Sequence, residues 1–166
     1  LDDTEHTNLT HISSLQRIFP ESYTWMDRFT MKNLELFNSN SINGFNLSDT
    51  IDETITSMGS RKLKSWIAFP LIDKKEIKKR QEIVKSIIKN DDISNTLDIK
   101  LNNISDIERL MSKIATYKIS PRELVNLKNS LENVSLIKDS LLVYNGILKN
   151  YGKSLPSTKS IIREIS

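Results

Sequence analysis

Over the last third of the sequence, apolar residues recur at alternating steps of three and four, and this spacing predicts a long amphipathic helix. The apolar positions are Leu124, Leu127, Leu131, Val134, Leu141, Tyr144, Leu148 and Tyr151. Lys138 interrupts this apolar face, and Gly152 with Pro156 predicts the end of the helix. A long helix of this kind suits the transmission of motion. The same periodicity is equally typical of an ordinary helix in a bundle.

The start of that helix is marked by the segment Ser120-Pro121-Arg122-Glu123. Serine suits the N-cap because its hydroxyl accepts a hydrogen bond from a free backbone amide. Proline suits the first helical position, where its nitrogen needs no partner. Glutamate at the third position completes a capping box, because its side chain bonds back to the N-cap amide. A helix that begins at Pro121 is therefore predicted.

Caps and apolar spacing predict more helices before this one. Thr56 is expected to cap a helix over 59–68 that ends before Pro70. Asp73 and Glu76 are expected to open the next helix as a capping pair. The buried side of that helix is predicted to carry Ile77, Val84, Ile87 and Ile88. One further helix is predicted from the same spacing at Leu97, Leu101, Ile104, Met111 and Ile114.

The beginning of the sequence has a mixed pattern. Residues 3–18 predict the end of a helix that Pro20 closes. β-branched and aromatic residues then alternate, which predicts short extended pieces at 23–26 and 34–37. The predicted fold class is therefore mainly α, with long amphipathic helices and a small extended or β portion near residues 23–37.

One aromatic residue is predicted to anchor the core. Leu63, Trp66 and Ile67 fall on one side of the helix over 59–68. A buried tryptophan is favoured over a base-stacking platform because apolar neighbours flank it. Truncating a buried aromatic side chain to alanine costs ~3–5 kcal/mol. Trp66→Ala is therefore expected to lower the melting temperature strongly.

Composition limits the class of protein. The 166 residues suffice for one domain with a core, and 24 basic against 21 acidic residues give no electrostatic argument for a nucleic-acid partner. The absence of cysteine excludes disulfides and thiolate metal sites. No apolar run approaches the ~20 residues that span a bilayer, and no signal peptide is recognised. We therefore expect a cytoplasmic protein without a membrane contact. The missing initiator methionine indicates a chain cut from a longer one.

The sequence predicts no catalytic, cofactor-binding or metal-binding site. His6 and His11 lie five positions apart, so they do not stack on a helix as zinc ligands at i and i+4 do, and surface positions are expected. Asp52 and Glu53 are adjacent carboxylates without a catalytic partner. Capping or turn chemistry explains them better than catalysis does.

The tripeptide Gly152-Lys153-Ser154 resembles the end of a phosphate-binding loop. Such a loop needs a second glycine five positions before the first residue of the tripeptide, and Ile147 stands there. Nucleotide binding at this segment is therefore not expected.

A basic segment follows Pro70. Its candidates for nucleic-acid contact are Lys74, Lys75 and Lys78, in a run that also holds Lys79, Arg80 and Lys85. The functional interpretation is contact with DNA phosphate. The favoured alternative is a solvated helix face on which Glu76 and Glu82 form ion pairs.

Two other arginines have specific expectations. Arg61 lies near the N-terminal end of its helix, where the helix dipole does not favour a cation. A hydrogen-bonding or inter-domain role for Arg61 therefore stays open. Asp106 and Arg109 are predicted to pair across one helical turn, at i and i+3.

Ordered motifs run along most of the sequence. A D-x-x-T-x-x-N-L-E-L pattern is carried by Asp27, Thr30, Asn33, Leu34 and Glu35. A D-x-T-x-T-x-M-G-x-R-x-L-x-x-W-x-x-x-P-L pattern follows, carried by Thr54, Thr56, Met58, Gly59, Arg61, Leu63, Trp66 and Pro70. Later come I-x-x-R-x-x-x-V at 77–84, D-I-E-R-L with Asp106, Glu108 and Arg109, and S-P-R-E-L around Pro121. In order and separation these motifs resemble the core, or lever, domain of the bacterial MutS family of DNA mismatch repair proteins.

The resemblance implies a helical coupling domain. Residues 23–166 would be the first half of the core domain (domain III), and residues 1–22 the end of the helical segment that joins the connector to the core. This part would be no enzyme and hold no cofactor, since the clamp and ATPase domains lie elsewhere in the family. Full-length family proteins are DNA-dependent ATPases that use ATP and Mg. They bind mismatched double-stranded DNA as homodimers and work with a MutL-type partner.

A second class of function stays open at this point. The chain is alternatively a non-catalytic helical interaction module that keeps the family motifs and has no role in repair. An ATPase domain with a phosphate-binding loop further along the coding sequence would favour the repair function.

Overall fold

The computed structural model describes residues 22–165, and helices account for most of this part. In chain order they are α1 (Arg28–Asn33), α2 (Leu47–Ile51), α3 (Ser57–Ala68), α4 (Lys74–Ile88), α5 (Asp91–Asn102), α6 (Ile107–Ala115), α7 (Pro121–Val143), α8 (Ile147–Ser154) and α9 (Lys159–Ile165). Between residues 22 and 165, the β structure is a single antiparallel bridge that joins Tyr23 to Leu71. This confirms the mainly α fold class. The helix expected at 3–18 and both histidines lie outside the described residues.

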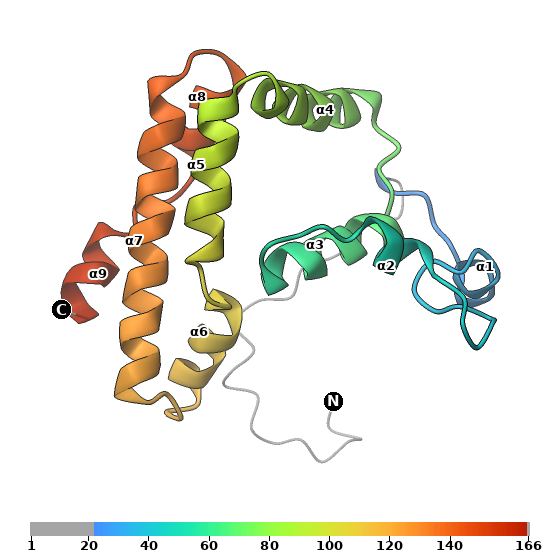
Figure 1. Cartoon of the computed structure of the whole chain (residues 1–166), viewed down its shortest axis with the longest axis horizontal. Helices are drawn as coiled ribbons and strands as arrows, with labels where there is room; N and C mark the ends of the chain where they lie inside the picture. Colours follow the sequence, from blue (N-terminus) through green and yellow to red (C-terminus); the bar gives the residue numbers. More distant parts are fainter. Residues whose placement is uncertain (1–21, 166) are drawn as a thin grey trace.

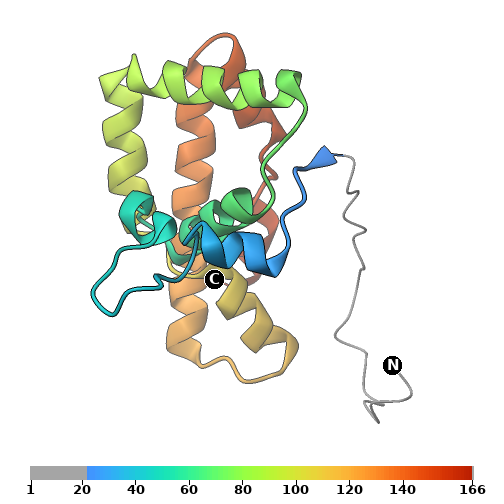
Figure 2. The ribbon, with the colours of Figure 1, turned by 90° about the vertical axis from the view of Figure 1, so that its right-hand side faces the viewer.

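The longest helix, α7, is the axis on which α5, α6, α8 and α9 pack. α5 and α6 lie along one side of it and α9 along another, while α4 crosses one end of the bundle (Figure 1). Figure 2 shows that an extended linker leads from the start of α4 back to α3, which lies away from the crossing end. The chain therefore passes from the α1–α3 segment through α4 into the bundle.

The predicted start of α7 is confirmed in detail. The Ser120 hydroxyl accepts a hydrogen bond from the Glu123 amide, at 3.3 Å between the heavy atoms. The Glu123 carboxylate accepts from the Ser120 amide at 3.0 Å, and Pro121 occupies the first helical position. The capping box therefore satisfies two backbone amides that the helix itself leaves without a partner.

The predicted end of this helix was wrong. α7 stops at Val143, and α8 begins only after Gly146, whose φ of 70° lies in the left-handed region that glycine adopts without strain. α8 then folds back onto α7, with Gly152 against Leu141. The apolar spacing runs through this reversal because Leu148 enters the same core from the second helix.

The single helix predicted across 97–114 is two helices, α5 and α6. Asn103 ends the first, and the Asp106 side chain caps the second. The buried Ser130 hydroxyl of α7 accepts a hydrogen bond from the Ser105 amide at 3.0 Å and donates to the Asn126 carbonyl at 2.8 Å. This hydroxyl holds the break against α7, so the four residues between the helices are packed rather than loose.

Two buried apolar clusters hold the bundle together. The first joins α5, α7 and α8 and consists of Ile93, Ile137, Leu141 and Leu148. The second lies between α6 and α7 and consists of Leu110, Leu127 and Leu131, with α9 packed against it. Burial of these side chains is the main stabilising contribution, because apolar surface removed from water gains roughly 25 cal/mol per Å².

The extended piece predicted at 34–37 is a turn. Asp27 caps the preceding helix α1 by accepting a hydrogen bond from the Thr30 amide at 2.6 Å. Glu35 then takes a positive φ of 49° and reverses the chain. Its carbonyl and that of Leu36 accept hydrogen bonds from the first amides of α2, so the turn serves as a cap for that helix. Of the extended portion expected near 23–37, the bridge at Tyr23 is what the structure contains.

The predicted cap of α3 is confirmed, and of the capping pair predicted for α4 Asp73 caps the helix, while no hydrogen bond joins Glu76 to the N-cap among the described residues. The Thr56 hydroxyl accepts from the Gly59 amide at 3.0 Å, and the Asp73 carboxylate accepts from the Lys75 amide at 2.8 Å. The predicted buried side of α4 is half right, since Val84 and Ile88 are exposed. Ile83 belongs to the inward face instead, where it lines an apolar cavity.

Trp66 is not a core anchor. Its side chain is 41% exposed, and the Arg80 guanidinium stacks on its ring at 3.9 Å from the ring centre. The apolar neighbours Leu63 and Ile67 are themselves only partly buried, because α3 contacts the bundle mainly near its N-terminal end.

This position changes the expected effect of truncation. A cation over an exposed aromatic ring contributes ~0.5–1 kcal/mol, and the partial burial of the ring adds to this, so Trp66→Ala is expected to cost roughly 2 kcal/mol. Urea unfolding of the chain measures this cost. Trp66→Phe, which keeps a ring under Arg80, should lose less. A loss of ~3–5 kcal/mol, typical of a buried aromatic side chain, would contradict the exposed position.

Candidate functional site

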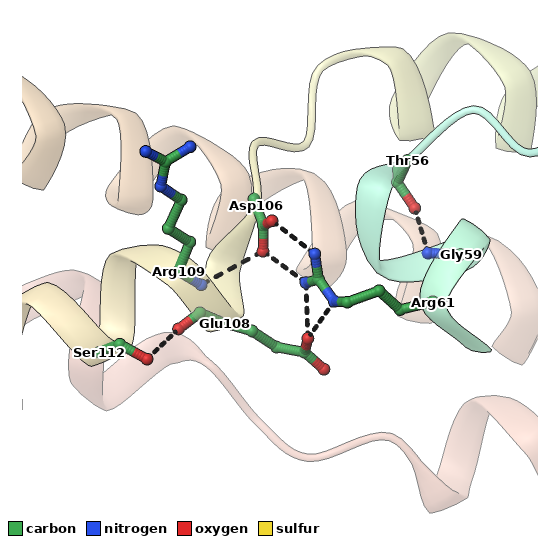
Figure 3. A network of polar contacts seen from close by, with 7 residues as sticks. All are labelled: Thr56, Gly59, Arg61, Asp106, Glu108, Arg109 and Ser112. Carbon is green, nitrogen blue, oxygen red and sulfur yellow. Dashed lines mark hydrogen bonds and ion pairs between the residues drawn. The ribbon is translucent and has the colours of Figure 1, made fainter. Parts of the chain in front are cut away.

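An ion-pair network joins α3 to the start of α6. It consists of Arg61, Asp106 and Glu108, which we call the α3–α6 network (Figure 3). The two terminal nitrogens of Arg61 donate to the two carboxylate oxygens of Asp106 at 2.8 and 2.7 Å. Its Nε and Nη2 also donate to Glu108 Oε2, at 3.0 and 2.6 Å. One guanidinium therefore holds two carboxylates, with both terminal nitrogens and Nε used.

Local sequence places these groups. The Thr56 cap starts α3 so that Arg61 comes one turn into the helix, and the Asp106 cap starts α6. Asp106 has two tasks, because its Oδ1 also accepts from the Arg109 amide at 3.2 Å. An arginine fork matches a carboxylate in two parallel hydrogen bonds, which gives direction as well as attraction. The network therefore fixes how α3 is oriented against α6.

The pairing predicted between Asp106 and Arg109 differs from the one observed. Arg109 contributes its backbone amide, and its guanidinium points away from Asp106 (Figure 3). The ion-pair partner of Asp106 is Arg61, 45 positions earlier in the chain. The hydrogen-bonding role left open for Arg61 is thereby established within this chain.

The network shifts the pKa values of its members in opposite directions. The hydrogen bonds from Arg61 are the main reason that the pKa of Asp106 falls from 3.8 to about 2. The hydrogen bonds to Asp106, followed by those to Glu108, raise the pKa of Arg61. A second pair acts in the same way, because Lys113 of α6 lowers the pKa of Glu123 in α7 to about 2. Both ends of α6 are thus tied by charge.

Acid should weaken these ties. Both carboxyl groups have a lower pKa in the folded chain than the ordinary values of 3.8 and 4.5, so the unfolded chain binds protons more readily. Their contribution to stability is present above those ordinary values. It should be lost as the pH falls through the window from about 4.5 to about 2. Denaturant midpoints measured across this window should therefore decrease.

Asp106→Asn is the matched variant for that titration. Asparagine remains a good N-cap but carries no titratable carboxyl group. Its denaturant midpoint should start lower than that of the unchanged chain at pH 5 and fall less steeply as the pH drops. Equal slopes for the two proteins would show that Asp106 does not titrate with a lowered pKa.

An apolar cavity of about 380 Å³ lies beside the network. Thr56 and Met58 of the α3 start face it on one side. The other walls come from α4, α5, α7 and α8 and the α5–α6 break, including Ile104, Leu141 and Tyr151. The polar α3–α6 network and this apolar contact together seat the N-terminal end of α3 on the bundle.

Most other motif residues have roles in local structure. Asp27 and Thr30 cap α1, Thr56 and Gly59 cap α3, and Pro121 starts α7. The turn chemistry expected for Asp52 is confirmed, because its carboxylate accepts hydrogen bonds from Thr54 and Ser60. The Pro70 carbonyl accepts from the Thr24 amide at 2.8 Å.

The basic candidates lie apart from the network. Lys74, Lys75 and Lys78 are exposed in the first turns of α4. The neighbouring ion pair expected for Glu76 is present, with Lys79 at 3.8 Å. Within residues 22–165, no ion pair is found for Glu82, which was expected to form one.

The tripeptide at Gly152 lies in the last turn of α8. A phosphate-binding loop precedes a helix, so this placement agrees with the register argument against nucleotide binding. Gly152 instead allows α8 to approach α7 closely, because a Cβ at this position would lie 2.9 Å from the Leu141 Cβ. Close packing of α8 on α7 requires glycine at this position.

The described residues hold no cluster of three or more His, Cys, Asp or Glu side chains that could bind a metal ion. In the same part of the chain, no helix combines the length and apolar character needed to cross a membrane. The notable polar feature is thus the α3–α6 network, which connects elements.

The fold and the network define a helical domain built around contacts between distant elements. Residues 29–165 match a family model described as MutS domain III. Over its full length the chain is 47% identical to the DNA mismatch repair protein MutS of Christiangramia forsetii, and over 83% of its length it is 46% identical to that of Flavobacterium johnsoniae. The chain belongs to the MutS family of DNA mismatch repair proteins. This confirms the predicted resemblance.

The match covers only a part of these relatives. The chain spans 19% of the Christiangramia forsetii protein and 16% of the Flavobacterium johnsoniae protein. The MutS protein of Phocaeicola vulgatus, 40% identical over the whole chain, is also matched over 19% of its length.

Proposed function

We propose that this chain is the first half of the core, or lever, domain of a MutS-type mismatch repair protein, and that it couples movements of other domains. The observation that carries the proposal is the α3–α6 network. It joins two helices whose residues are 45 and 47 positions apart, and all three of its members belong to the family motifs.

A coupling element needs parts that move together. α7 has 23 residues and therefore extends ~34 Å at 1.5 Å per residue. Its C-terminal part packs on α5 and α8, and its N-terminal part packs on α6. The network adds α3 to this unit, so a displacement of the α1–α3 segment would be passed to α6 and along α7. Coupling between distant sites requires such physically connected elements.

The remaining functions belong to the longer protein in this proposal. Residues 1–22 would end the helical segment from the connector, and the clamp and ATPase domains would lie outside this chain. There the protein would bind ATP and Mg, hydrolyse ATP in a DNA-dependent way, and bind mismatched double-stranded DNA. It would act as a homodimer in the cytoplasm with a MutL-type partner.

A graft tests the proposal. The 166 residues replace the matching segment of the Christiangramia forsetii MutS protein, in a strain that lacks its own MutS. We expect the graft to restore a low mutation rate. Arg61→Ala in the graft should raise the rate towards that of the deficient strain, while DNA binding of the purified protein persists. Lys62→Ala, at an exposed neighbour on α3, is the control and should leave repair intact.

The alternative function gives the opposite result. A helical interaction module without a role in repair would leave the mutation rate high, although the grafted protein is folded by circular dichroism. If Arg61→Ala leaves repair intact, repair does not require the α3–α6 network, and the coupling role is contradicted.

A further inference from the structure

Positive charge is concentrated in one stretch of the chain. Between residues 57 and 89 there are ten Lys or Arg residues and three Asp or Glu residues. The rest of the chain has an excess of acidic residues, since the whole sequence carries only +3. The nearly balanced total charge of the chain therefore conceals a strongly basic α3–α4 segment.

Four lysines of this stretch form a stripe along α4. An α-helix turns ~100° per residue, because it has 3.6 residues per turn. At that rotation four lysines fall within an arc of ~60°. They are Lys74, Lys78, Lys85 and Lys89, which we call the α4 lysine stripe, and all four are exposed. The stripe is ~22 Å long at 1.5 Å per residue.

The stripe faces away from the bundle. Ile83 and Ile87 line the apolar cavity on the inner side of α4, and the helical rotation places them about opposite the stripe. α4 itself crosses the end of the bundle, with one long side free of other described helices (Figure 2). Within residues 22–165, all four lysines of the stripe are therefore open to a long, straight ligand.

The lysines of the stripe are not neutralised within the described chain. Among residues 22–165 the ion pair on α4 is that between Lys79 and Glu76, and both lie off the stripe. Glu82 is the acidic residue nearest to the stripe, and it forms no ion pair there. Lys74 and Lys78 are like charges at i and i+4, as are Lys85 and Lys89, and a bound polyanion would relieve the repulsion within each pair.

We propose that the α4 lysine stripe binds the phosphodiester backbone of duplex DNA. A row of cations ~22 Å long matches a ligand that carries a regular row of phosphates. Val84 and Ile88 leave a small apolar surface exposed beside the stripe, so an anionic lipid surface is the competing polyanion, and the vesicle measurement below distinguishes it from DNA. Lys74 and Lys78 are thus contact residues, while Lys75 lies at the margin of the stripe.

The site deepens the proposed repair function and rests on it for the choice of DNA over other polyanions. Contacts to phosphate carry no sequence information, so matched and mismatched duplexes should bind equally. The site would hold DNA near the lever without taking part in mismatch recognition.

Fluorescence anisotropy of the 166-residue chain with a short labelled duplex tests the site. Four phosphate contacts predict a slope of about −3.6 in a plot of log affinity against log salt, which is a loss of roughly a hundredfold between about 50 and 200 mM salt. The triple variant Lys74→Gln, Lys78→Gln, Lys85→Gln should reduce the slope to about −0.9. Circular dichroism checks that α4 remains folded.

A second triple variant controls for net charge. Lys118→Gln, Lys153→Gln and Lys159→Gln alter exposed lysines elsewhere and remove the same charge. This variant should keep the slope near −3.6. Equal losses in both variants would overturn the proposal, because binding would then follow total charge. Equal affinity for vesicles of anionic lipid, or tighter binding of a mismatched duplex, would also overturn it.

The test is independent of the graft experiment. If the graft fails to restore repair, but the lysine variants change the salt dependence of DNA binding as expected, the lever function alone is contradicted. Successful repair with no binding of DNA by the isolated chain would contradict the stripe alone.

Discussion

Gly152→Val is expected to destabilise the chain by roughly 2–3 kcal/mol, because this close contact between two helices leaves no room for added carbons. At this position α8 meets α7, where a Cβ would lie 2.9 Å from the Leu141 Cβ and 3.4 Å from the Leu142 nitrogen and the Lys138 carbonyl oxygen. These atoms belong to or adjoin the backbone, so they cannot swing aside. α8 would have to move off α7 and expose Leu148, which is 3% exposed.

The measurement is the free energy of unfolding in urea, read by circular dichroism. Lys153→Val is the matched control, since it adds the same β-branched residue at an exposed position of the same helix. It should cost less than about 1 kcal/mol, as surface substitutions usually do. If Gly152→Val were tolerated as well as Lys153→Val, the close packing of α8 on α7 would be wrong.

Leu127→Ala should have a comparable effect. Leu127 is fully buried between α6 and α7, together with Leu110 and Leu131. Removal of such a side chain leaves a cavity and costs ~2–5 kcal/mol, which is a large share of the ~5–15 kcal/mol that stabilises a domain. The loss also loosens the seat of α6, the helix that presents two carboxylates to Arg61.

Leu136→Ala is the control for this change. It removes the same atoms from the same helix at a position that is 46% exposed. The expected difference between the two variants is at least about 2 kcal/mol in unfolding free energy. Similar losses for both variants would mean that the second cluster is not the core of the α6 end.

Local signals in the sequence predicted local structure well. Ser120, Thr56 and Asp73 each cap the helix expected of them, because a cap depends on residues within one turn. The turn around Asp52 follows the same logic. These elements are determined by contacts between near neighbours, and such contacts can be inferred from spacing.

Errors arose where packing between distant segments decides the outcome. The apolar spacing from Leu124 to Tyr151 is continuous, yet the chain reverses at Gly146, because both helices share one core. Trp66 has the spacing of a core residue, but the group that covers its ring is the Arg80 guanidinium of α4, and its side chain stays 41% exposed. Periodicity reports which residues share a face and does not report what covers that face.

The sequence identified the three members of the α3–α6 network as motif residues and predicted no contact between α3 and α6. Arg61, Asp106 and Glu108 all lie in the motifs that carry the family resemblance, but the sequence offered Arg109 as the partner of Asp106. The pairing of Lys113 with Glu123 was missed as well, since one residue ends α6 and the other starts α7. A single sequence has no signal for contacts between charged groups that are tens of positions apart.

The central claim is that the α3–α6 network holds α3 on the bundle, and a distance measurement tests it most directly. The chain contains no cysteine, so Lys62→Cys on α3 and Met111→Cys on α6, both exposed, accept spin labels without competition. Double electron–electron resonance should give one narrow distance distribution for the labelled chain.

Arg61→Ala should broaden that distribution or split it, because α3 loses its oriented contact with Asp106 and Glu108. Arg61→Lys should give an intermediate width, since an ammonium keeps the charge but lacks the planar fork. A distribution in Arg61→Ala as narrow as in the unchanged chain, and at the same distance, would contradict the claim.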